Sequence, residues 1–161
     1  MKKIFLSICA LLAIAGVANA AETKKKVPAT TNDAYIGVNV GVTTDAYTDV
    51  KSVGVTAGYA PVRALALEAA YERTDPRADT ATNAVWVNAL PTLRLGKLGV
   101  YGLGGVGYDF TNENEAYNVG AGVKIELTKA VEVDFRGRRI MQELTSFNGE
   151  NRVSAGLNFK F

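Results

Sequence analysis

The chain offers few side chains that could carry acid–base or nucleophilic chemistry. It contains no histidine, the residue whose pKa near neutrality suits general acid–base catalysis. Its single cysteine, Cys9, lies in an apolar N-terminal run. Glu132 and Asp134 stand at alternate positions and could work as an acid and a base, but Arg136 and Arg138 continue the same alternation. We therefore interpret these four residues as ion-pair partners and predict no catalytic residue.

The sequence also offers no signal for a cofactor. It has no cluster of metal-ligand type, no nucleophile motif and no phosphate-binding loop. Gly104, Gly105 and Gly107 form a glycine-rich stretch, but this stretch lacks the strand–helix context of a nucleotide site. We expect neither a metal nor an organic cofactor.

The first twenty residues have the pattern of a secretory signal peptide. A basic start, Met1-Lys2-Lys3, precedes an apolar run over residues 4–17, and Ala18-Asn19-Ala20 has the small–x–small form that signal peptidase recognises. The apolar run is short for a membrane-spanning helix. We predict a signal peptide over residues 1–20, cleavage between Ala20 and Ala21, and a flexible polar periplasmic segment over residues 21–33.

Export changes the charge balance of the protein. The full chain has 18 basic and 16 acidic residues, and removal of Lys2 and Lys3 leaves 16 of each. The mature chain is then formally neutral, so the basic balance is a targeting feature and gives no support for nucleic-acid binding. Removal of Cys9 leaves no cysteine, so the mature chain uses neither disulfides nor thiolate chemistry.

From residue 34 to the C-terminus, apolar residues recur at every second position, which is typical of β-strands with one apolar face. The facing of the fourth and fifth segments stays open, because Pro91 interrupts one and glycines dominate the other. Short connections alternate with longer polar ones, as periplasmic turns and extracellular loops of a membrane barrel do. We predict eight strands, at residues 34–42, 52–60, 64–73, 84–95, 100–110, 116–127, 130–140 and 152–161.

The polar face of these segments carries charges interleaved with glycine and alanine. In a narrow membrane barrel the apolar face contacts lipid, and small residues inside leave room for long charged ones. Charges buried in that way must be paired. We predict an ion-pair network in the lumen, made of Glu68, Arg94, Lys124, Glu126, Glu132, Asp134, Arg136, Arg138, Arg152 and Lys160.

Aromatic residues stand near the ends of the predicted strands. An even number of strands places both chain ends on the periplasmic side, which orients every strand. Amphipathic rings concentrate at lipid–water interfaces. We predict a periplasmic girdle of Tyr59, Phe159 and Phe161 and an outer girdle of Tyr71, Tyr108, Phe110 and Tyr117, with Trp86 as a further candidate for the outer one.

Two features resemble known outer-membrane proteins. An alternating last strand that ends in Phe161 resembles the signal recognised by the outer-membrane assembly machinery. The segments Gly105-Val106-Gly107-Tyr108-Asp109-Phe110 and Val119-Gly120-Ala121-Gly122-Val123-Lys124 resemble strands of the OmpA/OmpX-like eight-stranded barrel superfamily, a porin-like family. This resemblance covers residues 34–161. It implies an all-β, transmembrane, antiparallel up-and-down barrel in the Gram-negative outer membrane, reached by Sec-dependent export.

The resemblance narrows the possible functions. Enzymes among small outer-membrane barrels rely on histidine, which this chain lacks. We predict a non-enzymatic barrel that contributes to envelope structure or surface interaction. The alternatives are a narrow channel for ions or for small or hydrophobic solutes, and a soluble periplasmic ligand-binding barrel.

The partners expected from this interpretation are outer-membrane lipid, lipopolysaccharide, the assembly machinery and an unnamed extracellular partner. Acidic residues of the expected outer loops could share bridging divalent cations with lipopolysaccharide phosphates, or could simply be solvated. They are Asp45, Asp49, Asp75, Asp79, Glu113, Glu115, Glu143 and Glu150.

Overall fold

The computed structural model describes residues 33–44, 50–75, 81–143 and 149–161. The predicted signal peptide, the cleavage point between Ala20 and Ala21, and nearly all of the predicted segment 21–33 lie outside the described residues. Asp45, Asp49 and Asp79 of the expected outer loops lie outside them too. These assignments stay predictions.

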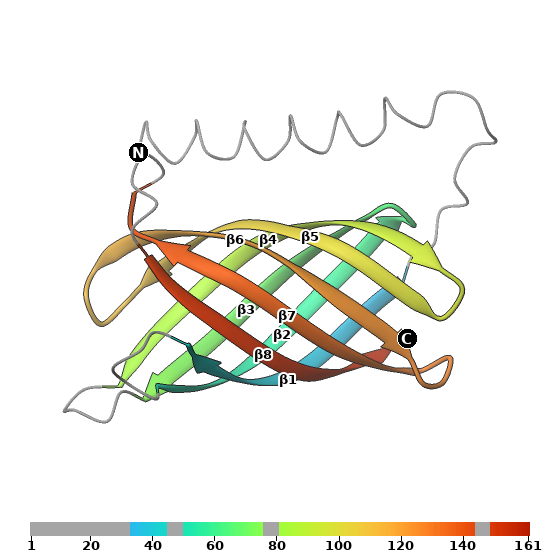
Figure 1. Ribbon diagram of the computed structural model, residues 1–161, viewed down its shortest axis with the longest axis horizontal. Coiled ribbons are helices and arrows are strands. Elements are labelled where there is room, and N and C mark those ends of the chain that lie inside the picture. Colours follow the sequence, from blue (N-terminus) through green and yellow to red (C-terminus); the bar gives the residue numbers. More distant parts are fainter. Residues whose placement is uncertain (1–32, 45–49, 76–80, 144–148) are drawn as a thin grey trace.

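The described chain forms a single closed sheet of eight strands (Figure 1). Each strand pairs antiparallel with the next, and β1 also pairs with β8, so the sheet has no free edge. The predicted all-β, eight-stranded, up-and-down barrel is confirmed, and predicted strand ends differ from observed ones by at most three residues. The strands are β1 (Asp33–Thr43), β2 (Lys51–Val62), β3 (Leu65–Asp75), β4 (Thr82–Leu95), β5 (Leu98–Asp109), β6 (Asn114–Glu126), β7 (Val131–Met141) and β8 (Gly149–Lys160).

Tight turns and longer loops lie at opposite ends of the barrel. The β2–β3, β4–β5 and β6–β7 connections are short and share one end with the C-terminus (Figure 1). In the β4–β5 turn, Gly96 has a φ of 65°, a left-handed conformation that glycine adopts without steric cost. At the opposite end, the Asp109 carboxylate accepts hydrogen bonds from the backbone N–H groups of Thr111 and Asn112. Among the described residues, no helix is long and apolar enough to cross a membrane.

The apolar face of the sheet points outward and the charged face points inward. Val119 and Phe159 are 47% and 51% exposed, whereas Lys124 is 6% exposed. The structure also settles β5, where Val100 and Tyr108 face outward. Trp86 faces inward with only 4% exposure, so its assignment to the outer girdle is wrong. Its position alternates with outward-facing neighbours, which sends the indole into the lumen.

Strand β4 departs from simple alternation in its middle. Ala89 and Leu90 are both buried, and Leu90 is fully inaccessible to solvent. The ladder between β4 and β5 skips Leu90 and Pro91, because proline has no N–H to donate. An apolar cluster therefore fills one side of the barrel interior, made of Ala60, Ala66, Leu90, Tyr101 and Leu103.

The charged lumen as the candidate functional site

A buried cluster around Glu68 occupies the middle of the lumen. Glu68 lies on β3 and is 2% exposed. Arg136, across the lumen on β7, donates to both carboxylate oxygens of Glu68, at 2.7 and 3.1 Å. Tyr35 donates to the same carboxylate at 2.9 Å and Asn88 donates to it at 3.2 Å. This bidentate, fully desolvated pair connects opposite walls of the barrel.

Asp134 completes the central cluster. It pairs with Arg136 and accepts a hydrogen bond of 2.5 Å from the Tyr101 hydroxyl. Two carboxylates therefore share one guanidinium, and Lys124 supplies further positive charge. Its ammonium lies 4.2 Å from the centroid of the Tyr35 ring and 5.5 Å from that of Tyr101. The rings stabilise this amine by cation–π attraction in a region that excludes water.

A second ion-pair cluster, the outer cluster, lies toward the loop end of the barrel. Glu72 on β3 accepts from Arg138 on β7 and from Arg152 on β8, the latter at 2.8 Å. Arg152 also donates to Glu150 at 2.5 Å and to the Thr74 hydroxyl at 3.1 Å. Each arginine has a carboxylate partner, so positive charge does not remain unpaired in the lumen.

A third, more open cluster lies at the turn end. Lys160 donates to Glu126 at 3.0 Å and lies 3.8 Å from Glu132. Lys124 lies 3.7 Å from Glu132, which links this cluster to the central one. Arg94 approaches Glu126 and Glu132 at 3.9 and 4.0 Å, with its side chain 34% exposed. All ten residues of the predicted network thus have an ion-pair partner in the structure.

The structure adds members that the sequence analysis did not assign to the network. Glu72 is buried in the outer cluster. In the central cluster, Tyr35, Tyr101 and Asn88 donate hydrogen bonds to the carboxylates. Glu150 was expected in an outer loop, but it belongs to β8 and contacts Arg152. The missed carboxylates do stand on the inward-facing alternation of their strands, so extending the same pattern would have found them.

Three glycines in the wall make room for aromatic rings. A Cβ at Gly58 would lie 2.0 Å from Tyr35 Cζ, and one at Gly122 would lie 2.3 Å from Tyr101 Cζ. A Cβ at Gly107 would similarly meet the Trp86 ring at 2.4 Å. From the sequence, we expected such glycines to accommodate charged side chains. Three of them instead accommodate aromatic side chains that cover the ion pairs.

The predicted girdle residues are exposed or half-buried on the outside of the barrel. The outer set contains an edge-to-face contact between Tyr108 and Phe110, with ring centroids 5.4 Å apart, and a hydrogen bond of 2.8 Å from the Tyr71 hydroxyl to Asn83. Their assignment to lipid–water interfaces stays a prediction. The turn-end set is Tyr59, Phe159 and Phe161, and the loop-end set is Tyr71, Tyr108, Phe110 and Tyr117.

A closed barrel with a valine-rich exterior and an interior of ion-paired charged side chains is the arrangement of proteins that cross a bilayer with strands. The family model "Outer membrane protein beta-barrel domain" matches residues 7–161. The chain belongs to this family. It is thus an integral protein of the Gram-negative outer membrane, in an environment of lipid and lipopolysaccharide. No curated protein matches the chain significantly.

Several solved structures have the same fold as this chain. A de novo designed transmembrane β-barrel has a TM-score of 0.67 and 18% identity, over 84% of this chain and all of the design. The N-terminal barrel domain of Pseudomonas aeruginosa OprF has a TM-score of 0.66 and 16% identity, over 81% of this chain and 98% of the domain. Yersinia pestis Ail has a TM-score of 0.60 and 14% identity, over 81% and 99% of the two chains. These similarities concern the fold alone.

Proposed function

We propose that this protein is a non-enzymatic structural component of the outer membrane, with a lumen closed to solutes. One observation supports this role above the others. Glu68, Arg136 and Tyr35 come from three different parts of the wall and meet in the middle of the barrel within hydrogen-bond distance. The interior of an eight-stranded barrel is only wide enough for side chains, and here those side chains hold one another in place.

The chemistry of the lumen supports a structural role over a catalytic one. Each buried carboxylate of the central and outer clusters accepts from arginine, so it is held as a partner of a permanent cation. A general acid or base needs a pKa near the working pH and access to substrate, which such pairs do not provide. The protein then contributes to the envelope through its outer surface, which contacts lipid of the outer leaflet.

Liposome swelling tests the closed lumen. Purified protein reconstituted into phospholipid vesicles should give no faster swelling in an isosmotic arabinose solution than empty vesicles do. Vesicles with a general porin serve as the positive control. Rapid swelling of vesicles that contain this protein, at matched protein-to-lipid ratio, would show an open pore and contradict the proposal.

The proposal includes the route to the membrane. We propose that residues 1–20 are removed on export, that residues 21–33 remain in the periplasm, and that the assembly machinery recognises the strand ending at Phe161. N-terminal sequencing of the protein extracted from outer membranes should begin at Ala21. An intact N-terminus starting at Met1 would contradict the predicted cleavage.

A further inference from the structure

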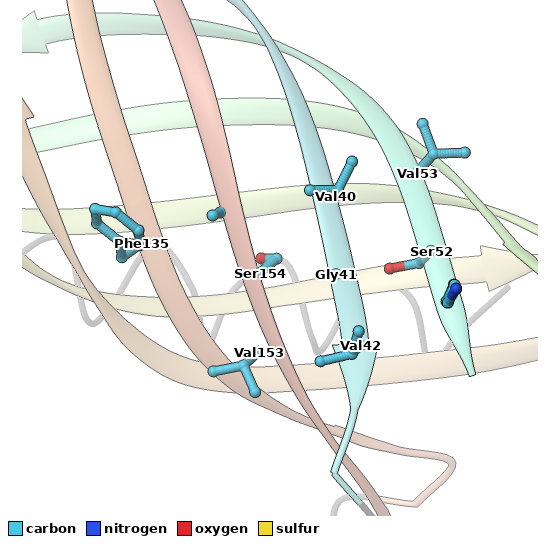
Figure 2. A pocket seen from close by; sticks show the side chains of 10 residues that line it. Val40, Gly41, Val42, Ser52, Val53, Phe135, Val153 and Ser154 are labelled. Atoms are coloured by element: carbon cyan, nitrogen blue, oxygen red, sulfur yellow. The ribbon is translucent and has the colours of Figure 1, made fainter. Parts of the chain in front are cut away.

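The lipid-facing wall carries a hollow across four adjacent strands near the loop end of the barrel. It has a volume of about 580 Å³, within the range of small-ligand sites. Figure 2 shows Val42 on β1 and Val153 on β8 beside each other, with Phe135 on β7 at one side and Val53 on β2 at the other. The lining is almost entirely apolar, so the hollow suits a hydrocarbon chain.

The shape of the hollow follows from side-chain size along two rows of the sheet. Phe135, Ala155, Val40 and Val53 are neighbours in register across β7, β8, β1 and β2. The small Ala155 lies between Phe135, 48% exposed, and Val40, 63% exposed, which form walls around it. In the next row toward the loops, Gly137 stands beside Val153, and a Cβ at Gly137 would meet nothing within 4 Å.

One cation marks the loop end of the hollow. Lys51 lines it, lies at the first position of β2, and pairs in register with Val42. Lys51 has no ion-pair partner among the described residues. Arg139 adds positive charge on the same outward face of β7, two positions beyond Gly137, where it donates to Asn151 at 3.2 Å. An amine at the headgroup end of an apolar groove attracts a phosphate attached to the chain that fills it.

A second hollow at the same end of the barrel provides a contrast. It has a volume of about 270 Å³ and lies across β4, β5 and β6, lined by Val87, Val106 and Tyr117 among others. The charged residue in its lining is Glu115, whose carboxylate would repel a phosphate. Both hollows have a mostly apolar lining, but the charged residue is the cation Lys51 in the first and the anion Glu115 in the second.

We propose that the hollow over β7, β8, β1 and β2 binds one acyl chain of a phosphorylated outer-leaflet lipid, the lipid A part of lipopolysaccharide, with Lys51 on its phosphate. In the proposed orientation the loop end of the barrel lies in the outer leaflet, so the lipid that fills the hollow is an outer-leaflet lipid. This inference deepens the proposed envelope role by naming its lipid partner, and it rests on that role. Swelling experiments report on the lumen alone, so a failure there and a failure of lipid binding are distinguishable.

Native mass spectrometry of detergent-purified protein with added diphosphoryl lipid A tests the site. Ala155→Phe fills the hollow, and Lys51→Gln removes its charge at an exposed position that does not support the fold. We expect both variants to lower the fraction of lipid-bound protein at least fivefold relative to wild type. Val106→Phe, which fills the second hollow, should leave that fraction unchanged. The heat-dependent gel shift of each variant verifies that it is folded before the comparison.

Three results would overturn the proposal. The first is equal retention of lipid A by wild type and Lys51→Gln. The second is equal retention by wild type of lipid A with and without its phosphates. The third is a two-chain complex that Ala155→Phe dissociates, without lipid retention, because a second copy would then be the occupant of the hollow.

Discussion

At the scale of single residues, the lumen is held by a few carboxylates that each bind more than one donor. Glu68 accepts from Arg136, Tyr35 and Asn88, and Glu72 accepts from two arginines. Both glutamates are nearly inaccessible to solvent. Charges in this setting are costly when a partner is lost, so the contribution of the network appears mainly when one member is removed.

Glu68→Gln should lower the free energy of unfolding by about 3–5 kcal/mol, because it leaves Arg136 buried with a single carboxylate partner. Urea unfolding in detergent micelles measures this. Asp75→Asn is the control, since Asp75 pairs with Arg73 on the exposed outer surface at 3.3 Å and should contribute about 0–1 kcal/mol. Equal losses of unfolding free energy in the two variants would show that the buried Glu68–Arg136 pair matters no more to stability than an exposed pair.

Gly122→Ala should lower the free energy of unfolding by about 1–3 kcal/mol, because its Cβ would overlap the Tyr101 ring. The same urea titration applies. Gly104→Ala is the control, since its Cβ would meet nothing within 4 Å. In a chain that already carries Tyr101→Ala, the added cost of Gly122→Ala should shrink; an unchanged cost would show that the ring is not the cause.

At the scale of strands, alternation with a period of two was enough to predict all eight elements and the facing of six of them. Alternation could not predict the facing in the middle of β4, where Ala89 and Leu90 are both buried and Pro91 is the only sign of a break in the sequence. Alternation also could not predict which side chains pair across the lumen. Glu72 meets Arg152 because closure of the sheet brings β8 within reach of β3 across the lumen. The stagger of a closed barrel cannot be derived from one strand at a time.

The last strand allows a prediction about assembly. Phe161→Ala should reduce the amount of folded protein in the outer membrane severalfold, measured by its heat-dependent gel shift, if the terminal ring is read by the assembly machinery. The side chain is 76% exposed, and the Phe161 N–H bond to the Ala34 carbonyl at 3.0 Å is retained in this variant. Stability after refolding in detergent should therefore change by less than about 0.5 kcal/mol.

Phe135→Ala is the control for this experiment, since Phe135 is an exposed outward aromatic on β7. It should accumulate in the membrane at the wild-type level. A similar loss for both variants would show that exposed aromatic rings act in general, and that the terminal position has no special part.

At the scale of the whole molecule, the short connections at one end of the barrel and the longer ones at the other predict its orientation in the membrane. Asn112→Cys, in the β5–β6 loop, should react with a membrane-impermeant maleimide on intact cells. Lys97→Cys, in the β4–β5 turn, should react only after the cells are opened. Labelling of the turn variant on intact cells would reverse the orientation on which the lipid site depends.

The pairing of β1 with β8 has a consequence for how the barrel forms. Seven of the eight ladders join strands that are neighbours in the chain, whereas this one joins Tyr35 to Lys160. Until that ladder exists, the nascent sheet has two unpaired borders, which invite association with other chains. This ladder joins the segments that lie farthest apart in the chain, so it carries the largest loop-closure entropy of the eight. A chain without β8 would keep both borders of the sheet unpaired, and we expect it to associate with other chains.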